Sequence, residues 1–454
     1  MIEINHQPRN GLQRMLSVTS GGQQITKAKT KHEFLTNQLM ERICEPANLN
    51  QAYKRVKANK GAPGVDGMTV EDLRPWIAAH KASLIESLLT GQYQPKPVRG
   101  VEIPKPGNKG MRQLAIPCAV DRLVQQAIHQ VLEPIFDPSF SASSYGFRPG
   151  RSAHMALKQA QKYVQEGNDI VVDIDLEKFF DRVNHDILMS RLSMRIDDKR
   201  LLKIIRAFLT SGMLQHGVCI GRDSGVPQGG PLSPLMSNLL LDELDKELEK
   251  RGHKFCRYAD DANIYVASQR AGERVLHSIS KFLEVRLRLK INENKSGCAP
   301  VGKRQFLGYR LLSDGKLVIA PKSLERVREK VRTLTRRNRG VSLEQVITEL
   351  NKTLRGWANY FHLTQWPSDL RNLDSWIKRK LRCYRLKQRK KNWPIAKFLI
   401  MLGVPADSAW NLARSGKGWW RLSRSVPVQH AMTNKWFEKQ GLINLQKTAN
   451  SLKI

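Results

Sequence analysis

The sequence predicts an α+β domain followed by an all-α domain. Apolar strand patterns alternate with helical patterns up to about residue 320, and short basic helices with little strand signal follow. At 454 residues the chain is longer than one hydrophobic core usually serves, so we expect two or three domains. The predicted limits are a flexible N-terminal arm at 1–40, an N-terminal extension at 41–84, the α+β domain at 85–311, the helical domain at 322–400 and a basic region at 401–454.

The first elements are a helix and a hairpin. A helical pattern covers Leu49–Lys60, and the turn-rich segment Gly61–Gly67 ends it, because its glycines and proline suit special backbone angles. Val98–Pro117 reads as strand, turn and strand. The tip of this hairpin, PKPGNKG, carries Lys105 and Lys109.

Strands and helices continue to alternate further along the chain. Periodicity and turn residues mark where each begins and ends. The expected elements are, in order, a helix at Val120–Leu132, a strand running into a helix at Asp169–Phe180, helical structure over 186–215, a glycine-proline loop and amphipathic helix at Ser224–Lys250, two strands within Lys254–Ser268 and a helix at Gly272–Leu287.

The charge of the chain points to a polyanionic partner. Lys and Arg number 76 against 41 acidic residues, which gives a formal net charge of +35. A chain that basic repels itself when compact, and nucleic acid is the usual partner that offsets the repulsion. No basic amphipathic helix with a separate apolar face is evident, so we expect nucleic acid and no membrane.

Hydropathy and cysteine spacing narrow the class of protein further. The apolar stretch Phe398–Val404 is too short to span a bilayer, and the N-terminus has no apolar signal core, so a cytoplasmic location is expected. The six cysteines are scattered without a C-x(2–4)-C pair, which argues against a zinc site and a disulfide framework.

Two places put acidic residues inside apolar strand patterns, where a charge costs energy. In Val171–Asp175, Asp173 and Asp175 point the same way, because side chains alternate across a strand. The second place is Tyr258–Asp261, which reads YADD. Gathered carboxylates repel each other unless a cation neutralises them, and Mg²⁺ is the natural one. Two such ions can activate a 3′-hydroxyl and stabilise a leaving pyrophosphate oxygen.

The turn that joins the two strands around YADD gives a second argument. We expect Asp260 and Asp261 to form its two-residue link. Type I′ turns prefer Asn-Gly or Asp-Gly, so the turn alone does not account for two aspartates. A lone Asp-Asp pair in a surface turn is common, but an acid-bearing strand in a chain of charge +35 favours the metal site.

An ordered series of motifs runs from Arg112 to Tyr309. The motifs are RQLAIP (Arg112–Pro117), SYGFRPGRS (Ser144–Ser152), DIDLEKFFD (Asp173–Asp181), GVPQGGPLSP (Gly225–Pro234), YADD (Tyr258–Asp261), LKINENKS (Leu289–Ser296) and FLGY (Phe306–Tyr309). Together they resemble the fingers and palm motifs of bacterial group II intron reverse transcriptases. The resemblance covers about residues 50–310 and implies a right-hand polymerase: fingers and palm, with an antiparallel palm sheet, before an all-α thumb.

The helical region continues the resemblance. LRGWANYF (Leu354–Phe361) is similar to the maturase signature in the thumb of this family, although its spacing alone predicts an apolar helix face for core packing. GKGWWRLSRS (Gly416–Ser425) resembles the DNA-binding segment of family members. Many members add an HNH-type endonuclease with paired cysteines and histidines, and no such cluster precedes Ile454. We therefore expect a member that lacks this endonuclease and primes synthesis from a nascent strand or a break.

The resemblance implies a role for each acidic residue. Asp175, Asp260 and Asp261 match the catalytic metal ligands, the carbonyl of Leu176 adds a ligand, and two Mg²⁺ ions are the cofactors. Asp173 lies outside the pattern, and we interpret it as supporting or structural. Lys295 matches the lysine proposed to protonate the leaving pyrophosphate.

Other motif positions match nucleotide-binding residues of the family. Phe180 matches the bulky residue under the incoming sugar, which excludes a ribose 2′-hydroxyl, although Phe179 and Phe180 also suit core packing. Gln228 matches the glutamine near the nascent base pair. On the hairpin, Arg112 starts the return strand and is the preferred contact to the triphosphate of a deoxynucleotide. Lys109 is an additional candidate.

The basic segments are candidates for nucleic-acid contact. Cations occupy nearly every face of 378–391, more than solvation requires. We expect them to contact RNA or primer–template phosphates, whereas core packing is the preferred role for the tryptophans and Tyr384 among them. The nucleic-acid-binding candidates are Lys105, Arg148, Arg151, Arg336, Arg337, Lys378, Arg379 and Lys380.

These features favour a group II intron protein that makes DNA on an RNA template and assists splicing. The expected partners are the intron RNA, an RNA template with a DNA primer, target DNA and deoxynucleotides, and the oligomeric state stays open. One alternative is an RNA-binding splicing cofactor with a vestigial polymerase site, although the intact acidic set argues against it. Another is a domesticated reverse transcriptase of defence or repair.

Overall fold

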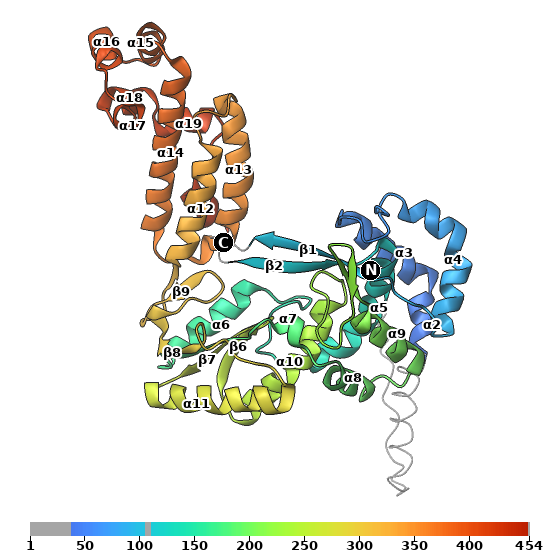
Figure 1. The fold of residues 1–454 in the computed structure, drawn as a ribbon. Helices are drawn as coiled ribbons and strands as arrows, with labels where there is room; N and C mark the ends of the chain where they lie inside the picture. Colours follow the sequence, from blue (N-terminus) through green and yellow to red (C-terminus); the bar gives the residue numbers. More distant parts are fainter. Residues whose placement is uncertain (1–37, 105–109, 453–454) are drawn as a thin grey trace, which may run out of the picture. The chain divides into compact units, whose positions relative to one another are not determined.

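A computed structural model describes residues 38–104 and 110–452 (Figure 1). Within these ranges the chain forms two compact units, each assembled from two stretches of sequence. The first unit comprises the residues up to Pro138 together with Phe180–Leu240. The second comprises Ser139–Phe179 together with the residues from Leu241 onward.

The first unit packs helices beside a four-stranded sheet. The sheet has the order β2-β1-β4-β5, with β1 at Val98–Pro104, β2 at Met111–Ile116, β4 at Met213–Gln215 and β5 at Val218–Ile220. The apolar face of α5 is buried, which makes this helix the centre of the unit. The helices are α2 (Leu39–Cys44), α3 (Pro46–Ala58), α4 (Leu73–Leu89), α5 (Ala119–Phe136), α8 (His185–Ser193) and α9 (Lys199–Thr210), and the short α7 (Phe179–Arg182) enters the unit from β3.

The second unit contains an antiparallel sheet of order β6-β7-β3-β8. Its strands are β3 (Ile170–Asp175), β6 (Lys254–Tyr258), β7 (Asp261–Val266) and β8 (Gly297–Pro300). Three helices accompany the sheet, namely α6 (Ala153–Gln165), α11 (Gln269–Phe282) and the C-terminal part of α10 (Ser233–Lys250). Gly272 lets α11 approach the sheet closely, because an added Cβ would lie 3.3 Å from Val172.

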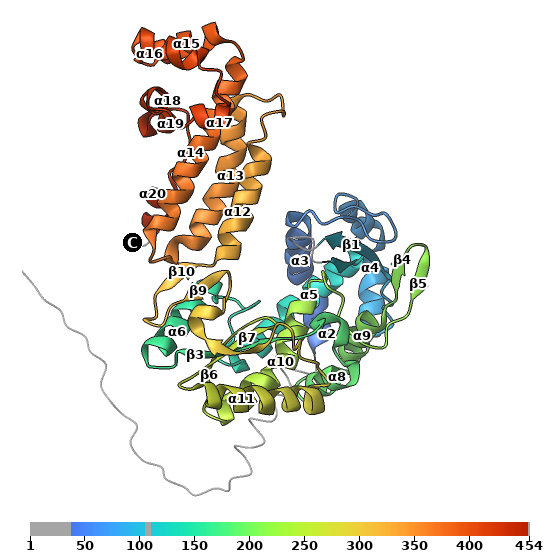
Figure 2. The same ribbon diagram turned by 60° about the vertical axis from the view of Figure 1, so that its left-hand side comes forward.

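After the antiparallel sheet, the second unit continues with a small β9–β10 hairpin (Tyr309–Leu311 and Leu317–Ile319). Helices follow this hairpin (Figure 2). One continuous hydrophobic core extends from α6 and the antiparallel β6-β7-β3-β8 sheet to the last helix, α20. The helices are α12 (Pro321–Leu334), α13 (Leu343–Tyr360), α14 (Pro367–Arg389), α15 (Asn392–Met401), α16 (Ala406–Arg414), α17 (Trp419–Leu422), α18 (Val426–Ala431), α19 (Asn434–Lys439) and α20 (Leu445–Asn450).

The predicted fold class, α+β followed by helices, is confirmed, and the predicted hairpin forms β1 and β2. Its tip residues Lys105 and Lys109 lie outside the described residues. The prediction of helical structure over 186–215 is wrong at its end, where β4 pairs with β1. A three-residue strand has no measurable periodicity, and its partner lies far away in sequence.

Two sequence expectations concern the whole chain. None of the helices in the described ranges combines the length and the apolarity that crossing a bilayer needs. All six cysteines are free thiols, as their spacing predicted.

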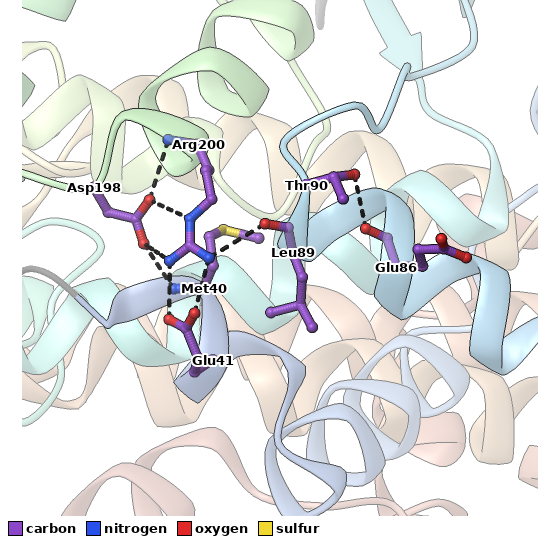
Figure 3. Close-up of polar contacts among 7 residues, drawn as sticks. All are labelled: Met40, Glu41, Glu86, Leu89, Thr90, Asp198 and Arg200. Atoms are coloured by element: carbon purple, nitrogen blue, oxygen red, sulfur yellow. Dashed lines mark hydrogen bonds and ion pairs between the residues drawn. The ribbon is translucent and has the colours of Figure 1, made fainter.

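An ion-pair cluster holds the first unit together around Arg200 (Figure 3). Arg200 Nη1 and Nη2 donate to the carboxylate of Glu41 on α2 over 2.8 and 3.0 Å. Its Nε and Nη2 donate to Asp198, which caps α9 and accepts from the amide of Met40 over 3.2 Å. The Asp198 side chain is only 2% exposed, so it depends on this guanidinium for its charge balance.

We predict that Arg200→Met lowers the free energy of unfolding by about 2 kcal/mol, because it leaves a buried carboxylate without its cation. Urea unfolding followed by circular dichroism measures the change. Arg206→Met on the same helix is the matched control, since Arg206 pairs with a mostly exposed Asp186 and should cost under about 1 kcal/mol. The Arg200 bonds lower the pKa of Glu41, so this part of the stability is present above the usual glutamate pKa and is lost as the pH falls through the folded value. Equal losses in both variants would contradict the prediction.

Candidate active site

The strand register brings three carboxylates to one face of the antiparallel sheet. Asp175 at the end of β3 lies opposite Asp261 at the start of β7, and Asp173 lies opposite Asn263. Directly opposed residues of antiparallel strands share a face, and so do residues two apart on one strand. Asp173, Asp175 and Asp261 therefore point the same way, as the strand pattern predicted for the first two.

These carboxylates line a cavity of about 750 Å³ that also contains basic side chains. Lys295 Nζ lies 2.9 Å from an oxygen of Asp175, and Arg304 Nη1 lies 3.6 Å from an oxygen of Asp173. Lys303, Arg310 and Lys322 complete the basic part of the lining. A cavity lined by both acids and cations suits a ligand that carries both a metal and phosphate groups.

The basic side chains of the cavity do not fully offset the negative charge of Asp173, Asp175 and Asp261. Burial raises the pKa of Asp261 to about 8, and the charges of Asp173, Asp260 and Asp175 add to the rise. Burial also raises the pKa of Asp173 to about 6, against the opposing effect of Arg304. A divalent cation would stabilise the ionised form of both groups.

The donor set fits Mg²⁺ only if the substrate supplies part of the coordination. In the ranges that the structure covers, no three acidic, histidine or cysteine side chains are grouped closely enough to hold an ion by themselves. Mg²⁺ is commonly held by one or two carboxylates together with substrate phosphates. The facing pair Asp175 and Asp261 matches that mode of binding, with Asp260 beside it.

The segment Leu289–Ser296, which carries the motif LKINENKS, fixes the end of β3. The amide of Asn292 donates to the carbonyl of Asp175 over 2.8 Å, and the amide of Glu177 donates to the carbonyl of Lys290. The hydroxyl of Ser296 accepts from the amide of Asp175 over 2.9 Å. The same segment thus positions Lys295 beside the Asp175 carboxylate.

The turn between β6 and β7 differs from the prediction. The link consists of Ala259 and Asp260, and Asp261 is already the first residue of β7. The expectation of an Asp-Asp link was wrong because Tyr258 pairs with Asp261, which places the two-residue link one position earlier in the chain. Ala259 has φ +59°, the positive value that hairpin turns require at their first central position and that alanine adopts at a cost of about 1 kcal/mol.

A buried arginine holds this strained turn. Arg257 donates through Nη1 to the carbonyl of Ala259 over 2.9 Å. Its other nitrogens bind both carboxylate oxygens of Asp245, at 2.7 and 2.5 Å, and the hydroxyl of Ser144 at 2.7 Å. Arg257 and Asp245 are at most 1% exposed, so solvent does not compete for these bonds.

The motif SYGFRPGRS packs against the same turn. The backbone of Ser143 and Tyr145 bonds to the backbone of Arg257, as an added strand would. Gly146 then lies directly under Ala259, because an added Cβ would clash with the Ala259 amide nitrogen and lie 2.9 Å from the carbonyl carbon of Tyr258. The glycine of this motif is therefore needed for close approach of two backbones.

The nucleotide-binding candidates of the first unit lie on one backbone framework. Arg112 is exposed on β2. On the same strand, the amide of Ala115 donates to the carbonyl of Gln228 over 2.9 Å. The carbonyl of Phe180 accepts from the amide of Val226 over 2.7 Å. Gly229 has φ +130°, and an added Cβ would lie 2.8 Å from the carbonyl oxygen of Ala115. Phe179 is buried and Phe180 is half-buried, so the core role falls to Phe179.

The nucleic-acid-binding candidates differ in their exposure and in the hydrogen bonds that they make within the protein. Arg148 donates to the carbonyls of Ser141 and Ser144, and Arg151 donates to the carbonyl of Ala142, so both guanidinium groups hold the local fold. Arg336 and Arg337 are exposed on the loop after α12. Lys378 is buried, and Arg379 and Lys380 are half-buried on α14.

Sequence reasoning missed two residues that position the site. Arg257 sits in an apolar strand pattern, FCRY, and a charge at a buried strand position was a usable signal. Arg304 donates to the carbonyl of Lys295 over 2.7 Å and pairs with Asp173, and no local pattern marks it.

Comparisons with known proteins agree with this arrangement. Residues 103–311 match the family described as "Reverse transcriptase (RNA-dependent DNA polymerase)", which is the class that the sheet and its acidic pair define. Residues 324–399 match "Group II intron, maturase-specific domain". Protein YkfC of Escherichia coli (strain K12) is 33% identical over 328 residues, which cover 63% of this chain and 86% of YkfC.

A second relative is named as an intron-encoded protein. The group II intron-encoded protein LtrA of Lactococcus lactis subsp. cremoris is 38% identical over 207 residues, or 45% of this chain and 34% of LtrA. A solved chain of a "Partial Cas6-RT-Cas1--Cas2 complex" is 29% identical, with a TM-score of 0.36 over 54% of this chain and 42% of that chain. The chain belongs to the group II intron reverse transcriptase and maturase family.

We predict that Gly146→Ala lowers DNA synthesis at least about tenfold while the fold is retained, because the added methyl group displaces the Ala259–Asp260 turn. Primer extension and a thermal melt measure the two effects. Gly221→Ala is the control, since a Cβ there meets nothing within 4 Å. Full activity in Gly146→Ala would contradict the assigned role of this close approach.

Proposed function

We propose that this chain is an RNA-directed DNA polymerase that uses two Mg²⁺ ions and also binds its parent intron RNA to promote splicing and mobility. The observation that carries the catalytic part is the facing pair Asp175 and Asp261 in a cavity with basic walls. Family membership supports the splicing part. We assign the activity to the cytoplasm on the sequence features alone.

The acidic residues would hold the metal and the primer terminus. Asp175 and Asp261 face each other across β3 and β7, and Asp260 stands on the adjoining turn, with the Leu176 carbonyl following Asp175. When bound, Mg²⁺ supplies Lewis-acid charge that activates the primer 3′-hydroxyl and stabilises the leaving pyrophosphate oxygen. Arg257 and Gly146 keep the turn that carries Asp260 in one conformation.

Lys295 would serve the leaving group. Its ammonium lies 2.9 Å from an oxygen of Asp175, and the side chain is 64% exposed and lines the cavity. A pyrophosphate bound there would take a proton from this ammonium as its charge develops. Arg304 donates to the carbonyl of Lys295 and so would fix the backbone from which this side chain extends.

The first unit would select the nucleotide. Arg112 on the exposed face of β2 is assigned to the triphosphate, and Gln228 to the nascent base pair. Phe180 would exclude a ribose 2′-hydroxyl and so favour deoxynucleotides. Support for this grouping comes from the backbone bonds that tie β2, the Gln228 loop and Phe180 to one another. Lys109 stays a sequence-based candidate.

The basic helices would bind the nucleic acids. The thumb-like segment from α12 to α14 carries Arg336 and Arg337 on a loop and Lys378, Arg379 and Lys380 on α14. We assign these residues to phosphates of intron RNA, template–primer and target DNA. Binding should weaken steeply with salt, since phosphate contacts release counterions.

We predict that Asp260→Asn reduces deoxynucleotide incorporation at least about a hundredfold on an RNA template with an annealed DNA primer. The assay contains Mg²⁺, and RNA binding and circular dichroism check that the variant is otherwise intact. Asp314→Asn is the control, because Asp314 is half exposed and contacts only the ammonium and the backbone amide of Lys316 among the described residues.

The outcomes separate the polymerase from a splicing cofactor. Wild-type synthesis that collapses in Asp260→Asn and persists in Asp314→Asn supports the polymerase. No synthesis by the wild type, with tight and salt-sensitive binding of intron RNA, would overturn the enzyme and favour the RNA-binding cofactor.

We predict that metal affinity rises with pH up to about pH 8, where the carboxyl of Asp261 loses its proton. Below that pH a bound cation must displace the proton, so affinity should fall by up to about tenfold per pH unit. Mn²⁺ titrated calorimetrically in two buffers of different ionisation enthalpy measures the proton released near pH 7. Asp261→Asn should bind more weakly and lose the proton release, and a wild type without pH dependence would contradict the role of Asp261.

A further inference from the structure

A buried histidine at the start of α8 contacts the loop that carries Gln228. The side chain of Asn184 caps this helix by accepting from the amide of Ile187 over 3.0 Å, and it thereby fixes the backbone from which His185 extends. His185 is 3% exposed, and its Nε2 lies 2.7 Å from the carbonyl oxygen of Gly225. A carbonyl oxygen only accepts hydrogen bonds, so Nε2 carries the proton and the bond fixes the tautomer of the ring.

The loop around Gly225 depends on such contacts for its conformation. Gly225 has φ +89°, in the region that favours glycine, and Gly229 has φ +130°. Glycine has no side chain to restrict its backbone, so bonds from the rest of the protein must hold it in one conformation. Gly225 is also buried, and a buried carbonyl that loses a hydrogen-bond partner destabilises the conformation to which it belongs.

The same loop is bonded to the backbone of Phe180. The amide of Gly225 donates to the carbonyl of Val183, and the amide of Val226 donates to the carbonyl of Phe180, each over 2.7 Å. A Cβ on Gly225 would lie 2.9 Å from the carbonyl oxygen of Phe180, so the two backbones are in direct contact. A displacement of Gly225 would therefore move Phe180, Gln228 or both.

The surroundings of His185 suit a positioning role better than proton transfer. Burial lowers the pKa of His185, against the opposing effect of the bond to Gly225, and the charges of Arg206 and Arg222 lower it further. The ring is therefore neutral near pH 7, and the proton on Nε2 is engaged by a backbone carbonyl. A general acid or base needs a proton that it can exchange with the substrate.

We propose that His185 is a positioning residue for selection of the incoming nucleotide and that it acts through the carbonyl of Gly225 on Phe180 and Gln228. The inference rests on the proposed function, because it takes Phe180 as the residue that excludes a ribose 2′-hydroxyl. It adds a residue outside the nucleotide site on which the choice between deoxynucleotides and ribonucleotides depends. A misplacement of about 1 Å at a group that orients a substrate can cost about a hundredfold in rate, so the loss of one bond behind the loop is measurable.

The test measures incorporation of a single nucleotide by the full chain on an RNA template with an annealed DNA primer. The matching deoxynucleotide and ribonucleotide are supplied in separate reactions, and the ratio of their kcat/KM values is the discrimination. His185→Leu should lower the discrimination at least about tenfold. It should raise the KM for the deoxynucleotide and leave kcat within about threefold of the wild-type value, since the chemical step uses other residues.

A pair of polar variants separates the hydrogen bond from the bulk of the ring. His185→Gln places an amide nitrogen at about the reach of Nε2 and should keep the discrimination within about threefold of wild type. His185→Asn is one methylene shorter, cannot reach the carbonyl of Gly225 and should lose discrimination about as His185→Leu does. This pair keeps the inference testable if His185→Leu fails to fold.

Two controls separate positioning from a general loss of stability. Leu192→Ala empties a fully buried position of the same helix, where the side chain has no hydrogen bond to lose. It should lower the melting temperature and change the discrimination by less than about twofold. In a Phe180→Ala background, His185→Leu should also change the discrimination by less than about twofold, because its effect passes through Phe180.

The outcomes distinguish this inference from the proposed function. A wild type that incorporates neither nucleotide would overturn the polymerase, and this inference with it. An active wild type whose discrimination is unchanged in both His185→Leu and His185→Asn would overturn the role of His185 alone. An equal loss in Leu192→Ala, or a full additional loss in the Phe180→Ala background, would also overturn it.

Discussion

Mutual repulsion among Asp173, Asp175, Asp260 and Asp261 is the constraint around which the second unit is arranged. Asp173 and Asp175 lie on β3, Asp261 begins the paired strand β7 and Asp260 lies in the turn before it. Burial raises the pKa of Asp261 to about 8. Three separate devices oppose the repulsion without neutralising it. Lys295 and Arg304 bring positive charge to the cavity, the segment 290–296 fixes the end of β3, and Arg257 fixes the turn. The charge that remains uncompensated is the part that a cation would satisfy.

Much of the fold was predictable from the sequence because local patterns determine it. The acid-bearing strand, the β1–β2 hairpin and the change to helices after residue 321 all carry strong periodicity or turn residues. The strands β4 and β5 were missed because each has only three residues, and because β4 pairs with β1, which is distant in sequence. The chain passes from one unit to the other after Pro138, Phe179 and Leu240. No local sequence pattern marks these boundaries, since they depend on which distant segments pack together.

The candidate site was predictable as a set of residue types and much less as a geometry. Strand alternation correctly grouped Asp173 with Asp175, and the register adds Asp261. The turn was displaced by one residue because nothing in YADD reveals that alanine adopts φ +59°. That conformation is stabilised by Arg257, Asp245 and Gly146, which are distant in sequence. The roles assigned to the site residues stay predictions until the proposed variants are measured.

The position of β3 within its sheet has a consequence for synthesis of the chain on the ribosome. β3 is an inner strand, yet it emerges before both of its neighbours, β7 and β8. Until those strands are translated, an apolar segment with two unpaired edges is exposed to other nascent chains. Asp173 and Asp175 interrupt that segment with like charges, which discourages two copies from pairing edge to edge. The same carboxylates that line the cavity would thus act earlier as gatekeepers against aggregation.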